Sequence, residues 1–182
     1  MELDVVRRAK RGDRNAFAEL AASAGDRLYA VAQRILRDPD AAGDATQQTL
    51  VKIWRRLPKL RDPERFDGWS YRLIVNACYD ELRRQRRPQG HLQLLESDGP
   101  MSDPTLTVAD RDQLERGFAR LTPEHRSVVI LQYYLDYSLP EIAAVLDIPV
   151  GTVRSRLHYA KRLLRSALEA DARQPMDRGR LA

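Results

Sequence analysis

The sequence predicts an all-α protein made of two small helical domains joined by a flexible linker, with a helix-turn-helix in the C-terminal domain. Runs rich in Ala, Leu, Arg, Glu and Gln dominate, and their apolar residues recur at the three-and-four spacing of amphipathic helices. Nine Gly and ten Pro are too few for low-complexity sequence. The stretch 88–109 has no such period and separates the two helical parts.

The composition limits the compartment and the partner. No window approaches eighteen uninterrupted apolar residues and the N-terminus has no secretory pattern, so we expect neither membrane insertion nor export. The single cysteine, Cys78, cannot form an intramolecular disulfide, which favours a cytoplasmic protein. The net charge is +5, and 27 of the 31 basic residues are Arg, which suits phosphates and base edges. Nucleic acid is therefore the first partner we expect.

Charge and composition place the domain boundaries. Residues 1–87 carry a net charge of +6, whereas residues 88–109 contain no Lys or Arg and three acids. That middle stretch also holds three prolines and two glycines between 88 and 104. We interpret it as an acidic flexible linker between a domain over 1–87 and a second domain over 110–170, followed by a tail over 171–182.

Two helices open the first domain. Asp13 is expected to cap a helix that reaches Ile35 and stops at Asp38–Pro39. A second helix, with Asp40 as its expected cap, runs to Leu57 and ends before Pro58. Its inward side is expected to hold Ala42, Ala45, Thr49 and Ile53, with Trp54 as a further candidate; its outward side holds Asp44, Gln47, Gln48 and Lys52. From residue pattern alone, that outward side is simply solvated surface.

The third helix, from about Asp67 to Arg87, combines an aromatic stripe with a basic end. Its stripe steps by three and four through Phe66, Trp69, Leu73, Asn76 and Asp80. If this face were core, Asn76 and Asp80 would each need a buried partner, because an unpaired buried polar group costs ~1–3 kcal/mol. Alternatively the face opens into a pocket where an unstacked base meets aromatic rings. The Arg cluster at 83–87, with Arg72, is denser than dipole compensation requires and favours phosphate contact.

The second domain has the signals of a helix-turn-helix. Thr122–Pro123–Glu124 begins a helix that we expect to reach Asp136. Ser138 and Glu141 form a capping box for a short helix, and a turn over 147–149 follows. A last helix then runs from about Val150 to Leu168, and its core edge is formed by Val150, Val153, Leu157, Ala160 and Leu164.

The opposite edge of this last helix is polar and basic. It carries Thr152, Arg154, Ser155, Arg156, His158, Tyr159, Lys161 and Arg162. Side chains at the start of such a helix reach base edges in the major groove, where Arg reads guanine and Ser or Thr serves either base type. A three-helix bundle with an incidentally basic face is the competing interpretation.

Catalytic and metal sites are not indicated. The three histidines (91, 125 and 158) lie far apart without metal-ligand spacing, and neither a Gly-rich phosphate loop nor a Gly-x-Ser-x-Gly pattern occurs. We expect no enzyme activity, no metal and no cofactor. Cys78, in mid-helix, is expected to be a packed thiol and not a redox sensor.

Three motifs in order resemble the extracytoplasmic-function (ECF) group of bacterial RNA polymerase sigma factors. The first is Asp38-Pro-Asp-Ala-Ala-Gly-Asp-Ala-Thr-Gln-Gln-Thr-Leu-Val-Lys-Ile-Trp54. The second is Phe66-Asp-Gly-Trp-Ser-Tyr-Arg-Leu-Ile-Val-Asn-Ala-Cys-Tyr-Asp-Glu-Leu-Arg-Arg84. The third combines Leu121-Thr-Pro-Glu124, Glu141-Ile-Ala143 and Val150-Gly-Thr-Val-Arg-Ser-Arg156. The resemblance covers roughly residues 10–87 and 110–168.

The resemblance implies a role for each surface. The polymerase beta-prime clamp coiled coil is expected to bind Asp44, Gln47 and Gln48. Minus-10 recognition and melting are expected to use Lys59, Arg61, Phe66, Trp69, Arg72, Asn76, Asp80, Arg83, Arg84 and Arg87. Minus-35 duplex recognition is expected to use Thr152, Arg154, Ser155, Arg156, His158, Tyr159 and Arg162. The implied partners are core RNA polymerase, including its beta flap, promoter DNA and an anti-sigma factor.

Two alternatives stay open at this point. A helix-turn-helix regulator acting without core polymerase explains residues 122–168 but leaves the stripe of residues 66–87 without a role. The first domain could also be a protein-interaction module only. Strand-selective binding of single-stranded minus-10 DNA in the presence of polymerase separates these alternatives from a sigma factor.

Overall fold

The computed structural model describes residues 3–86 and 115–172, and every regular element in these ranges is helical. Two compact units make up most of this part of the chain, one within residues 1–97 and one holding residues 115–142 and 148–172. The predicted all-helical class is thereby confirmed. The whole predicted linker (88–109), the predicted tail beyond residue 172 and the proposed DNA contact Arg87 lie outside the described residues.

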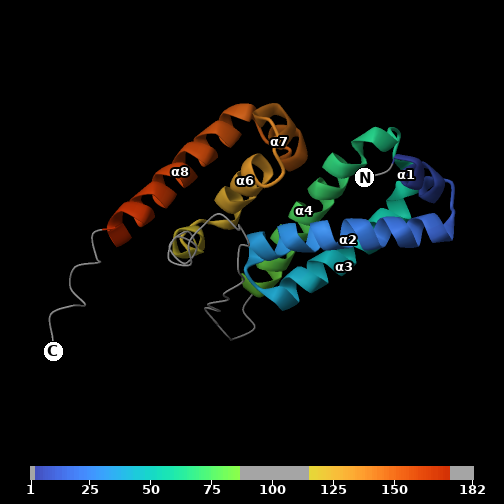
Figure 1. The fold of residues 1–182 in the computed structure, drawn as a ribbon, viewed down its shortest axis with the longest axis horizontal. Helices are drawn as coiled ribbons and strands as arrows, with labels where there is room; N and C mark the ends of the chain where they lie inside the picture. Colours follow the sequence, from blue (N-terminus) through green and yellow to red (C-terminus); the bar gives the residue numbers. More distant parts are fainter. Residues whose placement is uncertain (1–2, 87–114, 173–182) are drawn as a thin grey trace. The chain divides into compact units, whose positions relative to one another are not determined.

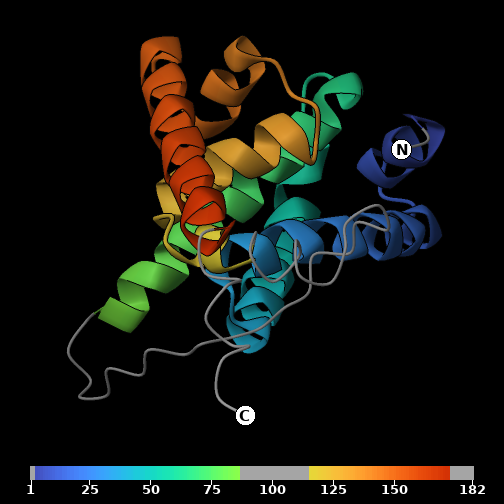
Figure 2. The ribbon, with the colours of Figure 1, turned by 60° about the vertical axis from the view of Figure 1, so that its left-hand side comes forward.

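The first unit is a three-helix bundle with a short additional helix. It contains α1 (Leu3–Lys10), α2 (Arg14–Leu36), α3 (Pro39–Arg56) and α4 (Phe66–Arg86). In both ribbon views α2, α3 and α4 lie side by side, and α1 lies at the N-terminal end of α2 (Figures 1 and 2). The largest side chains with almost no exposure include Leu20, Leu28, Ile35, Ile53, Leu57 and Ile74. Apart from Leu57, which directly follows α3, these come from the three long helices, so the bundle buries one shared apolar core.

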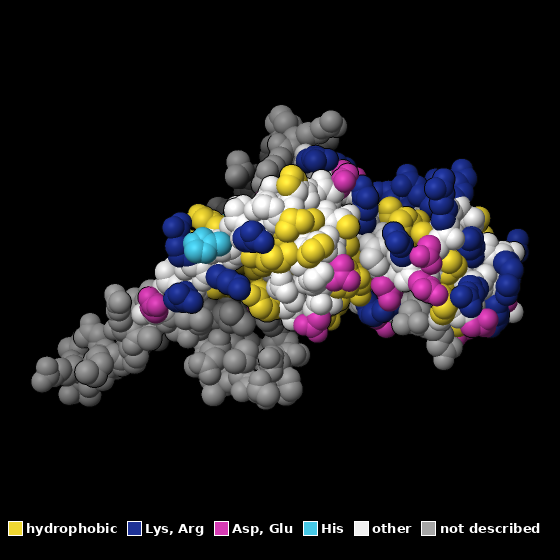
Figure 3. Space-filling model, turned by 90° about the horizontal axis from the view of Figure 1, so that it is seen from above, with side chains coloured by type: hydrophobic (Ala, Val, Ile, Leu, Met, Phe, Trp, Pro, Cys, Tyr) yellow, Lys and Arg dark blue, Asp and Glu magenta, His cyan; other side chains and the backbone are white. Residues whose placement is uncertain are grey.

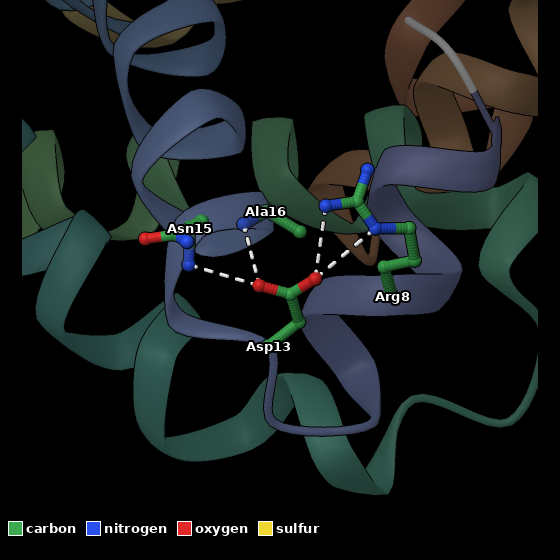
Figure 4. A network of polar contacts seen from close by, with 4 residues as sticks. All are labelled: Arg8, Asp13, Asn15 and Ala16. Carbon is green, nitrogen blue, oxygen red and sulfur yellow. Dashed lines mark hydrogen bonds and ion pairs between the residues drawn. The ribbon is translucent and has the colours of Figure 1, made fainter.

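Asp13 joins α1 to α2 with its two carboxylate oxygens (Figure 4). Oδ1 accepts hydrogen bonds from the backbone N–H groups of Asn15 and Ala16 at 2.9 and 3.0 Å, as the predicted N-cap requires. Oδ2 accepts from the Arg8 guanidinium at 2.9 and 3.1 Å. These hydrogen bonds hold the pKa of the Asp13 carboxyl below its usual value. Helix α1 was not among the predicted elements, so this corner is an addition to the expected fold.

The start of α3 differs from the prediction by two residues. Asp38, not Asp40, is the N-cap, and its Oδ1 accepts from the N–H groups of Asp40 and Ala41 at 3.0 Å each. The reason is Pro39, whose fixed φ suits the first helical position, so the cap must precede it. The helix ends at Arg56, one residue before the expected end, and Pro58 lies in a 3₁₀ turn, η1 (Leu57–Lys59).

The inward face of α3 is as predicted except at Trp54. Ala42, Ala45, Thr49 and Ile53 are buried. Trp54 is 45% exposed and packs edge-on against Phe17, with the ring centroids 4.5 Å apart. A second 3₁₀ turn, η2 (Pro63–Arg65), leads directly into α4.

The second unit begins with a helical segment at 115–119, followed by α6 (Pro123–Tyr133). Thr122 is the N-cap and Pro123 the first residue of α6, as predicted. The expected end at Asp136 was wrong, because α6 ends at Tyr133. The backbone then departs from helical geometry, and Asp136 has φ 54° in the left-handed region.

The helix-turn-helix is present as α7 (Leu139–Leu146), a turn, and α8 (Val150–Ala172). Glu141 accepts from the backbone N–H and the hydroxyl of Ser138, so the capping pair forms. In the turn, Asp147 has φ 58°, a left-handed conformation that Asp tolerates better than most residues. Along α8 the residues Val153, Leu157 and Ala160 are buried as predicted, whereas Leu164 is half-buried and Val150 is 37% exposed.

No helix in the described ranges combines the length and the hydropathy needed to span a bilayer.

Candidate nucleic-acid interface

The outer face of α3 carries the first candidate surface. Asp44 and Gln47 are exposed, as predicted, and Gln48 is half-buried. The Gln48 side-chain oxygen accepts a hydrogen bond from Arg84 Nη2 of α4 at 3.1 Å. Gln48 is therefore committed to α4 in this structure, and Asp44 and Gln47 are the more open pair.

A polar seam runs between α3 and α4 beside this face. Asp80 lies 4.0 Å from Lys52 Nζ and 3.3 Å from Arg83 Nη1, and Arg84 Nη2 lies 2.9 Å from Glu81 Oε2. The Arg83 and Arg84 side chains are still 77% and 53% exposed. The ion pairs of Asp80, whose side chain is 51% exposed, contribute little, about 0–1 kcal/mol, so a phosphate can replace that carboxylate at small cost. Glu81 is only 12% exposed, so its pairing with Arg84 is harder to give up.

The aromatic stripe of α4 changes from buried to exposed along the helix. Phe66 is 2% exposed and Leu73 is 7% exposed, whereas Asn76 and Asp80 are exposed. The interpretation of this whole face as core was therefore wrong for the two polar residues. The burial of Phe66 equally removes it as an accessible platform for a base.

The end of α3, the 3₁₀ loop (residues 57–65, which contains η1 and η2) and α4 line an open hollow of about 470 Å³. Its lining consists of Arg56, Lys59, Leu60, Arg61 and Trp69. Trp69 is half-buried, and its ring centroid lies 5.9 Å from that of Phe66, which supports it from the core side. The structure thus brings together Lys59, Arg61 and Trp69 of the predicted minus-10 set. It leaves Phe66, Asn76 and Asp80 outside this lining, and Arg72 is exposed on the same helix.

The outer face of α8 presents the predicted polar and basic side chains. Arg154, Ser155, His158, Tyr159 and Arg162 are exposed, and Thr152 and Arg156 are half-buried. The Ser155 hydroxyl donates to the Thr152 carbonyl oxygen at 3.0 Å. Since Val153, Leu157 and Ala160 face the core, the exposed set forms a continuous stripe on one side of α8. In Figure 3 the Lys and Arg side chains are densest over the first unit, at the right of the view, and fewer of them lie at the left.

His125 is a neighbour of this stripe that the sequence reasoning left out of the site. It stands in the first turn of α6, and its ring centroid lies 4.7 Å from that of Tyr159. Burial, together with the positive charge of Arg156, lowers the pKa of the His125 imidazole. His125 lies 34 positions before Tyr159 in the chain, so no local sequence pattern could have placed it beside the stripe.

Cys78 and the ionisable residues offer no metal or redox centre in the described part of the chain. The Cys78 side chain is fully buried, as predicted, and burial raises the pKa of its thiol to about 12. Within residues 3–86 and 115–172, His, Cys, Asp and Glu side chains nowhere gather in threes as a metal site requires.

Comparison with known proteins connects these surfaces. The sigma-70 region 2 family model matches residues 20–88, and the sigma-70 region 4 model matches residues 111–164. The RNA polymerase sigma-E factor of Streptomyces coelicolor is 33% identical over 85% of this chain and 86% of its own length. The ECF RNA polymerase sigma factor SigM of Mycobacterium tuberculosis is 32% identical over 82% of this chain and 76% of its own length. The chain belongs to the ECF family of RNA polymerase sigma factors.

A further relative agrees with this family, and two solved structures agree with the fold. The ECF sigma factor SigW of Bacillus subtilis is 26% identical over 90% of this chain and 94% of its own length. CnrH, solved with the cytosolic domain of CnrY, has a TM-score of 0.67 at 25% identity and covers 93% of this chain and 98% of its own. The sigma factor RpoE of Bartonella quintana, solved with the anti-sigma factor NepR, has a TM-score of 0.72 at 22% identity, over 85% and 98% of the two chains.

The predicted family and the predicted role are therefore confirmed: this sigma factor directs transcription initiation by RNA polymerase. The region 2 match on residues 20–88 also gives the first unit a role that a helix-turn-helix regulator acting alone leaves unexplained.

Proposed function

We propose that this sigma factor uses three separate surfaces to start transcription. The outer face of α3 binds the beta-prime clamp coiled coil of core polymerase, the hollow beside α4 captures a base of the minus-10 element, and α8 reads minus-35 duplex DNA. The observation that carries the proposal is the division of α8, which buries Val153, Leu157 and Ala160 and exposes a stripe of base-reading and phosphate-binding residue types.

On α3, the polymerase contact is made by Asp44 and Gln47, with Gln48 at the border of the surface. Trp54, 45% exposed two turns after Gln47, extends the same side and adds an apolar anchor supported by Phe17. Aromatic side chains held in this way are typical of the energetically important residues of an interface.

In the hollow, Trp69 offers a ring for stacking, while Lys59 and Arg61 bind the adjoining phosphates. Unstacking a base from the duplex costs a few kcal/mol. Stacking on an aromatic ring recovers ~1–3 kcal/mol per base, and the exposed arginines of α4 add phosphate contacts. Asn76 and Asp80, exposed farther along α4, meet the strand outside this lining.

The domain boundaries of the proposal are 1–87 and 110–170, with the acidic linker 88–109 passing through the positively charged interior of the polymerase. The C-terminal domain also contacts the beta flap. The protein acts in the cytoplasm and without catalytic activity of its own. A cognate anti-sigma factor is a further proposed partner, supported by the complexes in which the two solved relatives were determined.

Run-off transcription tests the proposal. Purified bacterial core polymerase transcribes a library of promoter fragments with and without this protein. We expect start sites that appear only with the protein and share two spaced motifs. Specific DNA binding without polymerase-dependent initiation, despite active core, would favour an operator-binding regulator.

Trp69→Ala tests the hollow. We expect promoter opening, measured by the permanganate reactivity of minus-10 thymines, to fall roughly 5- to 150-fold, because ~1–3 kcal/mol of stacking is lost. Binding of the closed complex should change little. Trp54→Ala is the matched control, since it should weaken core binding and leave opening by assembled holoenzyme intact. Normal opening by Trp69→Ala holoenzyme on linear templates would remove the role of Trp69.

A further inference from the structure

Tyr159 on α8 is held by two neighbouring side chains although it is 41% exposed. Its ring centroid lies 4.7 Å from the His125 ring at an interplanar angle of 32°, and 5.3 Å from the guanidinium carbon of Arg162. Both separations fall in the favourable range for aromatic pairs and for cation–π contacts. The ring is therefore in contact with two side chains that favour this orientation.

His125 is itself fixed by the start of α6. Its Nδ1 lies 2.8 Å from the hydroxyl oxygen of Thr122, the N-cap of this helix. The ring is half-buried, and burial together with the charge of Arg156 lowers the pKa of the imidazole, which favours its uncharged form. A series of contacts from Thr122 to His125 and from His125 to Tyr159 thus connects the start of α6 with the outer face of α8.

Tyr159 stands in line with the polar reading residues. Thr152, Ser155, Tyr159 and Arg162 follow spacings of three, four and three, so they share one side of α8. Ser, Thr and Arg side chains offer hydrogen bonds to a groove, whereas the ring of Tyr159 offers mainly apolar surface. In the major groove, the apolar group that marks a base is the thymine C5-methyl.

We propose that Tyr159 is a specificity-determining residue that contacts a thymine methyl group in the minus-35 duplex, and that His125 is the positioning residue that holds its ring. The proposal rests on the proposed function of α8 as the minus-35 reader. Arg162 is the second side chain in contact with this ring, and its charge stays available for a DNA phosphate.

The test removes single methyl groups from DNA. Holoenzyme made with the full chain is titrated with minus-35 duplexes, from the promoter found by run-off selection, in which each thymine is replaced in turn by deoxyuridine. We expect one position at which this replacement weakens wild-type binding about fourfold, as loss of one buried methyl-sized group does. Tyr159→Ala should abolish the difference at that position, and Tyr159→Phe should keep it.

The positioning role has its own variants. His125→Ala should reduce the methyl effect, and His125→Phe, which keeps a ring beside Tyr159, should restore it. Tyr133→Ala is the matched control, because Tyr133 is another exposed aromatic of this unit with a cation, Lys161, over its ring at 5.4 Å. It should leave the methyl effect unchanged. Thermal midpoints of all variants identify any that fail to fold.

Each outcome has a distinct meaning. Sequence-specific minus-35 binding with no deoxyuridine-sensitive position would overturn the methyl contact and leave the proposed function intact. A full methyl effect in His125→Ala would overturn the positioning role alone. Loss of affinity on all sequences in Tyr159→Phe would make the tyrosine hydroxyl a phosphate contact instead. Absence of specific minus-35 binding by wild-type holoenzyme would overturn the proposed function and this inference together.

Discussion

Cys78 shows how burial controls the chemistry of one residue. Its side chain is fully buried in α4, and the thiol pKa is raised to about 12 because the surroundings cannot solvate a thiolate. Raising the pH from 7 to 9 therefore produces almost no native thiolate. We predict that an aromatic disulfide reagent modifies the folded protein at least ~10³-fold more slowly than the unfolded chain, since modification waits for opening.

The check is the absorbance of the released thiol in native buffer and in denaturant at pH 8. One equivalent should appear rapidly in denaturant, because the chain has one cysteine. Rapid release of a full equivalent from the native protein would show that Cys78 is accessible, and a sensor role would then return to consideration.

At the scale of the element, the contacts of a helix decide whether a Gly→Ala change raises or lowers the free energy of unfolding. A Cβ at Gly25, in mid-α2, would meet only Leu50 Cδ1 at 3.8 Å, an ordinary contact. A Cβ at Gly117 would lie 3.2 Å from Leu164 Cδ2 and 3.3 Å from Ala167 Cβ, both on α8. We predict that Gly25→Ala raises the free energy of unfolding by about 0.5–1 kcal/mol. Gly117→Ala should lower it by about 1 kcal/mol, because overpacking exceeds the gain in helix propensity.

The measurement is hydrogen exchange of the most protected amides in α2 and in α8, which reports each unit separately. Both substitutions add the same methyl group inside a helix, so each is the control for the other. Stabilisation by Gly117→Ala would mean that α8 moves aside without cost, and the close approach at this glycine would lose its structural meaning.

At the scale of the whole molecule, the net charge of +5 and the exposed arginines on both units predict a strong dependence of promoter binding on salt. The exposed arginines should differ in what they contribute. Arg83→Ala should reduce the slope of log K against log salt concentration by about 0.9, as loss of one phosphate contact does, and should leave sequence preference unchanged.

Arg154→Ala should weaken promoter binding by ~1–3 kcal/mol and relax the preference at one minus-35 position.

Titration of holoenzyme with promoter and mutated promoters between about 50 and 200 mM salt separates the two effects. Equal losses on every sequence for Arg154→Ala would reduce that residue to a phosphate contact. A changed sequence preference for Arg83→Ala would contradict its assignment to the DNA backbone.

Much of this architecture was predictable because its signals are local. Asp13 and Thr122 cap helices through bonds to residues two or three positions away, and the buried edge of α8 follows a simple period. The errors arose where distant groups decide. Helix α1 buries Val5, Val6 and Ala9 and contacts α2 and the two 3₁₀ turns, of which η2 lies more than fifty residues further along the chain. Trp54 remains 45% exposed and packs edge-on against Phe17 of another helix.

In the candidate site, too, the locally determined residues were predicted and those that depend on tertiary packing were not. The exposed stripe of α8 follows from helix geometry, so its residues were predicted as a set. The burial of Phe66 and the lining of the hollow depend on how the 3₁₀ loop folds against α4, which no spacing rule describes. His125 reaches Tyr159 only through tertiary packing, and its part in the site was therefore missed.

The positions of the two tryptophans allow each proposed binding surface of this sigma factor to be followed by intrinsic fluorescence. The chain contains two tryptophans, Trp54 on the proposed polymerase surface and Trp69 in the proposed minus-10 hollow. Changing one of them to Phe leaves a single emitter on the other surface. Stopped-flow fluorescence of the two variants, mixed with a core polymerase in which tryptophan is replaced by a non-fluorescent analogue, would time clamp capture and base capture as separate events within one initiation reaction.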